Sequence, residues 1–248
     1  MALVSTPAIV LHSFKYGDTS KIVRLLTRDH GVQSAIAKGA FRPKSSFGAR
    51  LQFLSQGSAQ LYLKQTRDLQ TLAGFDLTAQ REGLAQDLQR YAAAAALAEL
   101  VLRLSPQERH PEIFDLLARS LDDLERVPGA AVPTVGLAAM WSMVSTLGFA
   151  PAVDRCARDG RALAPGSARF SVADGGLLCS ACSAGAQTSK LPAEDRTVLE
   201  GLVVGYPDVG PLTVRRTAAH RRLLARFVRH HAAEERELRA LEFWEAGR

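Results

Sequence analysis

The fold is decided by a series of short apolar segments separated by turns. The clearest member of the series reads Lys21-Ile-Val-Arg-Leu-Leu-Thr-Arg-Asp-His-Gly-Val-Gln-Ser-Ala-Ile-Ala-Lys38, with turn composition at residues 29–31. Similar segments occur at residues 6–14, 51–54, 58–63 and 69–75. Five or six short strands without an intervening helix predict a small antiparallel barrel over residues 1–78. A five-stranded barrel of the oligonucleotide-binding (OB) type is the leading interpretation, with an SH3-like barrel or a small sandwich as alternatives.

Positive charge is concentrated between Asp29 and Asp68, a stretch that contains no acidic residue. Glycine and proline residues in this stretch break any helix, so we expect a loop after the strand. The cations of this loop are Lys38, Arg42, Lys44 and Arg50. Phe41 and Phe47 lie among them, and uncancelled positive charge with exposed rings suits phosphates and stacked bases. The alternative is a solvated basic loop with two core phenylalanines.

The overall composition also favours a polyanionic partner. The chain has 248 residues, of which 47% are hydrophobic, and a formal net charge of +6. This length suffices for one large domain or for two to three small ones. No segment approaches the roughly 18 consecutive apolar residues of a membrane span, and no secretory signal is visible. We therefore expect a cytoplasmic protein without a membrane partner.

Helical periodicity replaces the strand pattern after residue 78. Segments with apolar residues at helical spacing begin near Leu84, Pro111, Pro133, Pro192 and Thr213. Gly148 is expected to cap the third of these helices, and the tail Glu234–Glu245 to be a short docked helix or a frayed end. The pattern predicts an α-helical bundle built from residues 79–148 and 188–248. The chain is therefore expected to be an α+β multidomain protein.

All three cysteines lie in a segment, residues 149–187, that interrupts the helices and is rich in Gly, Ala, Ser and Pro. Cys179-Ser-Ala-Cys182 has the form of half a zinc knuckle, and Cys156-Ala-Arg-Asp159 precedes it by about twenty residues. A carboxylate can ligate zinc, so three thiolates and Asp159 predict a structural zinc site in a zinc-finger-like insertion. The alternative is a degenerate site that holds no metal and leaves three free thiols.

A second basic stretch contains no acid between Asp208 and Glu234. Its candidate DNA-binding residues are Arg215, Arg216, Arg222 and Arg226. On a helix, one face is shared by Arg215, Arg222, Arg226 and Arg229. A long stretch without acids indicates a phosphate track, and the alternative is an ordinary solvated helix face.

No catalytic motif is visible in the sequence. It lacks Gly-x-x-x-x-Gly-Lys, Gly-x-Ser-x-Gly and the paired acids of a two-metal nuclease. The second predicted helix carries acids that we expect to be solvated rather than metal-binding: Asp115, Asp122, Asp123 and Glu125. We expect a non-enzymatic DNA-binding protein. A scaffold that binds acidic tails and a metal-dependent nuclease are the alternatives.

Two groups of motifs carry a resemblance to a known family. The first is the run from Ala8 to Gly31 followed by Ala37-Lys-Gly-Ala-Phe-Arg-Pro-Lys-Ser-Ser-Phe-Gly48. The second is Leu147-Gly-Phe-Ala-Pro-Ala-Val-Asp-Arg-Cys156 with the later Gly-Gly-Leu-Leu-Cys-Ser-Ala-Cys182. Together they span nearly the whole chain and resemble the RecO family of bacterial DNA repair proteins.

This resemblance implies an OB barrel, a helical bundle and a zinc-finger element in a non-enzymatic, nucleoid-associated recombination mediator. Such a protein binds single- and double-stranded DNA, anneals complementary strands, engages the C-terminal tail of the single-strand-binding protein, and with RecR helps to load RecA. On this chain the loop cations become DNA contacts, and the second basic stretch either extends the DNA track or receives that tail. Asp159 stands where many members have cysteine, which bears on zinc occupancy rather than on the fold.

Overall fold

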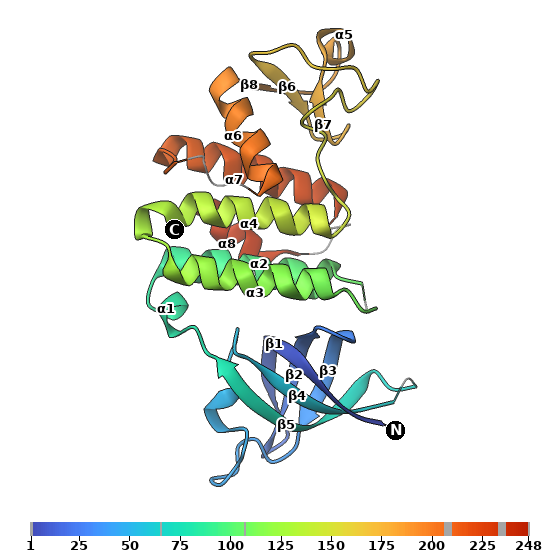
Figure 1. Cartoon of the computed structure of the whole chain (residues 1–248), viewed down its shortest axis with the longest axis vertical. Helices are drawn as coiled ribbons and strands as arrows, with labels where there is room; N and C mark the ends of the chain where they lie inside the picture. Colours follow the sequence, from blue (N-terminus) through green and yellow to red (C-terminus); the bar gives the residue numbers. More distant parts are fainter. Residues whose placement is uncertain (1, 65, 107, 206–209, 233–236, 248) are drawn as a thin grey trace. The chain divides into compact units, whose positions relative to one another are not determined.

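The computed structural model describes residues 2–64, 66–106, 108–205, 210–232 and 237–247. It divides into two compact units, one formed by residues 1–86 with 98–125 and the other by residues 87–97 with 126–248. The first unit holds a β-barrel and helix α3, and the second holds most of the other helices and a small β-sheet (Figure 1). The structure is therefore α+β, as predicted.

Five strands form the closed barrel of the first unit (Figure 1). They are β1 (Ala2–Tyr16), β2 (Ser20–Thr27), β3 (Gly31–Ala37), β4 (Gln56–Leu63) and β5 (Leu69–Ala79). Their order around the barrel is β1-β2-β3-β5-β4, and only the β3–β5 pair is parallel. This five-stranded closed arrangement confirms the predicted OB-type barrel.

The barrel interior is filled by small and medium apolar side chains. Along each strand every second residue points inward, which explains the alternation seen in the sequence. The strands contribute buried residues that include Ala8, Val10, Val23, Leu25, Ala35, Ala37, Ala59, Leu61, Leu72 and Phe75. Ala40, Phe47 and Leu51 join this core from outside the strands, so the segment between β3 and β4 is part of the barrel's packing.

The segment Leu51–Leu54 is not a strand, and the prediction of one there is wrong. It follows a short 3-10 helix, η1 (Gly48–Arg50), and Leu54 has a left-handed φ of +66° that interrupts any extended run. The Leu54 backbone N–H donates to the Val10 carbonyl at 2.8 Å, which ties the turn to β1. The apolar pattern of this segment therefore reflects burial of a turn rather than pairing in a ladder.

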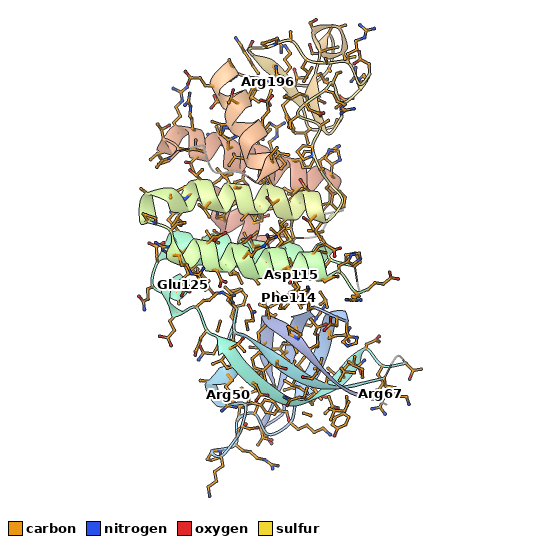
Figure 2. All side chains as sticks on the ribbon, viewed as in Figure 1. Arg50, Arg67, Phe114, Asp115, Glu125 and Arg196 are labelled. Atoms are coloured by element: carbon orange, nitrogen blue, oxygen red, sulfur yellow. The ribbon has the colours of Figure 1, made fainter. Side chains whose placement is uncertain are left out.

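Helix α3 (Pro111–Arg126) is bonded to the barrel segment of its own unit through paired charges. Arg28 donates from Nε and Nη2 to the two carboxylate oxygens of Asp115, each at 2.9 Å. Arg81, whose side chain is only 3% exposed, donates from Nε to Asp122 at 2.7 Å. Figure 2 shows Phe114 and Asp115 on the side of α3 that faces the barrel.

These contacts correct the expectation that the acids of α3 are solvated. Asp115 and Asp122 pair with arginines, and Glu125 accepts a hydrogen bond from the Gly83 backbone N–H at 3.0 Å. Asp123 is exposed. A bidentate arginine–carboxylate pair fixes orientation as well as charge, so these acids hold α3 in place.

Three helices of the remaining chain begin where Pro133, Pro192 and Thr213 predicted them. The single helix expected from near Leu84 is instead two helices, because the chain turns at Gln86 and Asp87 Oδ1 accepts from the Arg90 backbone N–H at 2.9 Å at the start of the second. The helix bounds are α1 (Glu82–Ala85), α2 (Leu88–Leu104), α4 (Val132–Thr146), α6 (Ala193–Val204), α7 (Val214–His231) and α8 (Arg239–Ala246). Thr213 caps α7, because its hydroxyl accepts from the Arg216 backbone N–H, and Gly148 follows α4 with a φ of +95°. The predicted tail begins at Glu234, and its residues 234–236 lie outside the described residues. Asp208 also lies outside them. No described helix combines the length and the apolar character that crossing a membrane requires.

A small three-stranded sheet lies within the second unit (Figure 1). Its strands are β6 (Ala168–Ser171), β7 (Gly176–Leu178) and β8 (Ser189–Leu191), in the order β7-β6-β8, and α5 (Ser180–Ser183) follows β7. Phe170 of β6 lies in edge contact with Phe227 of α7, with ring centroids 6.1 Å apart. Trp141 of α4 contacts the same ring at 5.3 Å, so aromatic packing joins the small sheet to the helices of its unit.

Candidate nucleic-acid interface and metal centre

The basic loop between β3 and β4 presents its cations to solvent. Lys38, Arg42, Lys44 and Arg50 are all exposed. Gly39 adopts a φ of +70°, and the Arg42 N–H donates to its carbonyl at 3.0 Å, which sets a tight turn at the start of the loop. Figure 2 shows Arg50 at the far end of the same loop. Among the described residues, no carboxylate lies within ion-pair distance of these four side chains.

The two phenylalanines of the loop have opposite roles. Phe47 is buried in the barrel core, whereas Phe41 is 49% exposed. The Phe41 backbone N–H donates to the Thr19 carbonyl at 2.9 Å, which ties the loop backbone to the β1–β2 turn. Lys21 Nζ lies 5.5 Å from the ring centroid and donates to the Leu51 carbonyl at 3.1 Å. Partial burial of this ammonium lowers the pKa of Lys21.

Two further exposed aromatic rings lie at the end of β1. Phe14 is 46% exposed and Tyr16 is 52% exposed, and both lie at the end of β1 that leads into the turn contacting Phe41. The sequence reasoning did not single out either ring. Their spacing of two residues, which places both rings on one face of β1, is the signal that would have identified them. An exposed ring beside cations suits base stacking.

Some arginines of α7 are exposed without an acidic partner among the described residues, and others are paired with acids. Arg215, Arg222 and Arg226 are exposed. Arg216 is paired with Glu194 and lies 3.2 Å from Asp195 of α6, so its charge is already compensated. Arg229, which shares the predicted face, pairs with Glu245 of α8.

Arg221, another arginine of the same helix, is buried. Its guanidinium carbon lies 5.0 Å from the Trp244 ring centroid, and Nη1 donates to the Trp244 carbonyl at 3.2 Å. Nη2 donates to Gln89 Oε1 at 2.9 Å, and burial lowers the pKa of Arg221. The absence of acids from the sequence around α7 therefore does not make every arginine available, because acids from α6 and α8 reach the helix.

Four side chains predicted as metal ligands come together at the edge of the small sheet. Cys156, Asp159, Cys179 and Cys182 each offer one ligand atom, and these atoms all lie within 4.8 Å of one another. Asp159 Oδ2 is 3.5 Å from Cys179 Sγ and 3.3 Å from Cys182 Sγ. The Cys182 backbone N–H donates to Cys179 Sγ at 3.4 Å, which positions the second thiol of the pair. The predicted ligand set therefore forms one cluster.

Two separations in this cluster, 3.3 and 3.5 Å, match those between the ligands of a tetrahedral metal ion. Zinc–ligand bonds of about 2.0–2.3 Å place the ligand atoms of a tetrahedron roughly 3.3–3.8 Å apart. Gly160 supports this geometry, since its φ of +72° and its N–H bond to the Cys156 carbonyl at 2.9 Å turn the chain back after Asp159. Three sulfur atoms and one carboxylate could hold a divalent ion of borderline softness.

Two family models together match most of the chain. The model for the Recombination protein O N terminal matches residues 1–81, and the model for the Recombination protein O C terminal matches residues 85–239. This chain belongs to the RecO family. The family is one of DNA repair proteins, so the basic barrel is the barrel of a DNA repair protein.

Individual RecO relatives align over most of their length. The DNA repair protein RecO of Nocardioides sp. is 34% identical over 246 residues, which cover 96% of this chain and 97% of the relative. The protein of the same name from Rubrobacter xylanophilus is 35% identical over 201 residues, covering 80% and 79%. That of Anaeromyxobacter dehalogenans strain 2CP-C is 32% identical over 238 residues, covering 93% and 92%.

The protonation of the cluster in this RecO-family chain follows from Asp159. Hydrogen bonds from the Cys156 thiol, the Arg161 backbone N–H and the Cys182 thiol hold the pKa of Asp159 well below its usual range. The same carboxylate raises the pKa of Cys182 to about 12. Without metal the carboxylate is therefore charged and the Cys182 thiol is protonated, so a metal ion that binds here displaces a thiol proton.

The contrast between the two loop phenylalanines gives a test of the loop's structure. Replacing Phe47 with Ala removes a buried ring from the RecO barrel core and is expected to lower the free energy of unfolding by about 3–5 kcal/mol. Phe41→Ala is the matched control, and its effect is expected to stay within about 0.5–1 kcal/mol because the ring is half exposed. Urea denaturation measures both. Equal losses in the two variants would contradict the buried position of Phe47.

Proposed function

We propose that this RecO-family chain is a non-enzymatic recombination mediator that binds single- and double-stranded DNA and anneals complementary strands. With RecR it assists RecA loading on DNA coated by the single-strand-binding protein, in the cytoplasm at the nucleoid. The observation that carries the DNA-binding part is the exposed loop of Lys38, Arg42, Lys44 and Arg50, whose charges have no carboxylate partner among the described residues. Unpaired cations release counterions from DNA when they bind phosphates, which supplies affinity for any sequence.

The surface of the barrel supports both kinds of DNA. Loop cations contact phosphates, which single and double strands share. The exposed rings of Phe14, Tyr16 and Phe41 offer stacking surfaces that only unpaired bases can use. A mediator that pairs strands needs both contacts, since it holds strands before and after they anneal.

The exposed arginines of α7 serve as the second basic surface in this proposal. Arg215, Arg222 and Arg226 have the exposure that contact with DNA or with an acidic tail of the single-strand-binding protein requires. Arg216 contributes less, because Glu194 and Asp195 already compensate its charge. The partner assignments to RecR, RecA and the single-strand-binding protein rest on the family to which the chain belongs.

The arrangement of acids speaks against the nuclease alternative. Asp115, Asp122 and Glu125 of α3 are occupied by hydrogen bonds to Arg28, Arg81 and the Gly83 backbone. Among the described residues, the single group of side chains able to hold a metal ion is the cysteine cluster. A closed set of four protein ligands favours a structural role for zinc, since catalytic zinc keeps one position open.

The DNA-binding proposal is tested by removing two loop cations together. Lys38→Gln with Arg42→Gln is expected to weaken binding to all sequences alike and to reduce the slope of log K against log salt by about two. Fluorescence anisotropy over a salt series measures this. The matched control is Arg155→Gln with Arg239→Gln, which changes the net charge equally at exposed sites paired with neighbouring acids. An unchanged slope in the loop variant would remove the loop from the DNA contact surface.

The structural zinc proposal is tested at Asp159. Asp159→Ala removes one of four ligands and is expected to lower zinc affinity about 10–100-fold, whereas Asp159→Cys restores a thiolate and retains zinc at least as well as the natural residue. Metal content after dialysis against a chelator gives the comparison. Equal zinc retention in wild type and Asp159→Ala would show that the carboxylate is not a ligand.

A further inference from the structure

The two faces of the small sheet differ in character. Phe170 of β6 packs on Phe227, so the face that carries Phe170 is directed at α7. Neighbouring residues of a strand point to opposite faces. Arg169 therefore lies on the other face, where its register partners are Leu178 of β7 and Lys190 of β8. On this second face, Arg169 of β6 and Lys190 of β8 lie directly opposite one another.

The cationic face of the small sheet is the floor of a groove with a volume of about 880 Å³. Leu178 lies at its base, and its walls come from residues 162–168 and from the segment 179–186 that contains α5. The walls consist mainly of alanine, serine and glycine, which allow the backbone of a ligand to approach closely. The residues that line the groove include three cations, Arg169, Lys190 and Arg196, but neither a carboxylate nor an aromatic ring.

Two of the three cations in the groove have no carboxylate partner in the part of the chain that the structure describes. Arg196 pairs with Glu200 at 2.7 Å and also donates to the Ala164 carbonyl, so its charge is compensated and it stabilises the wall of the groove. Arg169 donates to the neutral hydroxyl of Thr188 at 3.3 Å, and Lys190 is exposed. Like charges directly opposite one another in a sheet are destabilising, and an anion between them removes that cost.

We propose that this groove is a second DNA-binding site, in which Arg169 and Lys190 bind phosphates of the DNA backbone. Serine hydroxyls that line the groove are neutral donors for phosphate oxygens. Arg226 of α7 donates from Nη1 to Ser189 Oγ at 3.4 Å, and Ser189 is the register partner of Phe170. The arginines of α7 therefore meet the other face of the small sheet, and the groove is a separate cationic surface. Since no aromatic ring lines the groove, it recognises the backbone and not the bases, and it accepts duplex as well as single strands.

This inference rests on the proposed DNA-binding function and gives it a mechanism. The barrel loop and the groove lie in different compact units, so one molecule has two separate sites for DNA. A molecule that holds two DNA segments raises their effective concentration near one another. The groove therefore supplies the second DNA-binding site that strand annealing needs.

The test replaces Arg169 and Lys190 with Gln in the full, zinc-loaded chain. The salt slope for duplex DNA is expected to fall by about 1.8, since two phosphate contacts contribute roughly 0.9 each. Capture of a fluorescent duplex by protein already bound to an immobilised duplex is expected to be lost. The matched control is the Arg155→Gln, Arg239→Gln double variant, which carries the same charge change and is expected to keep both the slope and the capture.

Two outcomes would overturn the inference. An unchanged salt slope with normal duplex capture would show that the groove does not contact DNA. Unchanged duplex binding with lost binding of a labelled peptide of alternating Asp and Ala would make the groove a site for acidic peptides instead. Neither outcome changes the effect expected of the Lys38→Gln, Arg42→Gln variant. If the proposed function itself were wrong, the wild-type chain would not bind duplex DNA at all.

Discussion

Burial of Phe47 and Leu51 in the end of the barrel is the interaction on which the functional surface depends. These side chains complete the barrel core from a segment that is not itself a strand. The segment is anchored in the core at Ala40 and again at Phe47 and Leu51, whereas Lys38, Arg42 and Lys44 on either side of Ala40 are exposed. The same stretch therefore stabilises the fold and displays the charge.

The distribution of carboxylates is the second determinant of which cations are available. Acids on α3 pair with Arg28 and Arg81 and so stabilise the first unit. Acids on α6 and α8 pair with Arg216 and Arg229. Among the described residues, the cations without such partners include Lys38, Arg42, Lys44 and Arg50 of the barrel loop. They also include Arg169 and Lys190 of the small sheet. Availability of charge, rather than the number of basic residues, thus separates the proposed DNA contacts from the structural arginines.

Local pattern was sufficient to predict the barrel, the helix starts near Pro111, Pro133, Pro192 and Thr213, and the metal-ligand cluster. Strand alternation, first-turn prolines and the spacing of Cys179 and Cys182 are all short-range signals. The failures have a common cause in long-range pairing. The strand expected at Leu51–Leu54 is a buried turn, and the solvated acids of α3 are paired with Arg28 and Arg81, more than forty residues away along the chain. Likewise, Arg216 and Arg229 were expected to be available because their partners, Glu194 and Glu245, are distant in sequence.

The central claim is that DNA covers the loop cations of the barrel, and lysine footprinting tests it most directly. The lysines of the chain are residues 15, 21, 38, 44, 64 and 190, so each modified site can be read individually by mass spectrometry. Acetylation is compared with and without a saturating oligonucleotide. The account predicts that DNA protects Lys38 and Lys44 from the reagent, because phosphates occupy their ammonium groups. Equal modification of Lys38 and Lys44 in the free and DNA-bound protein would contradict it.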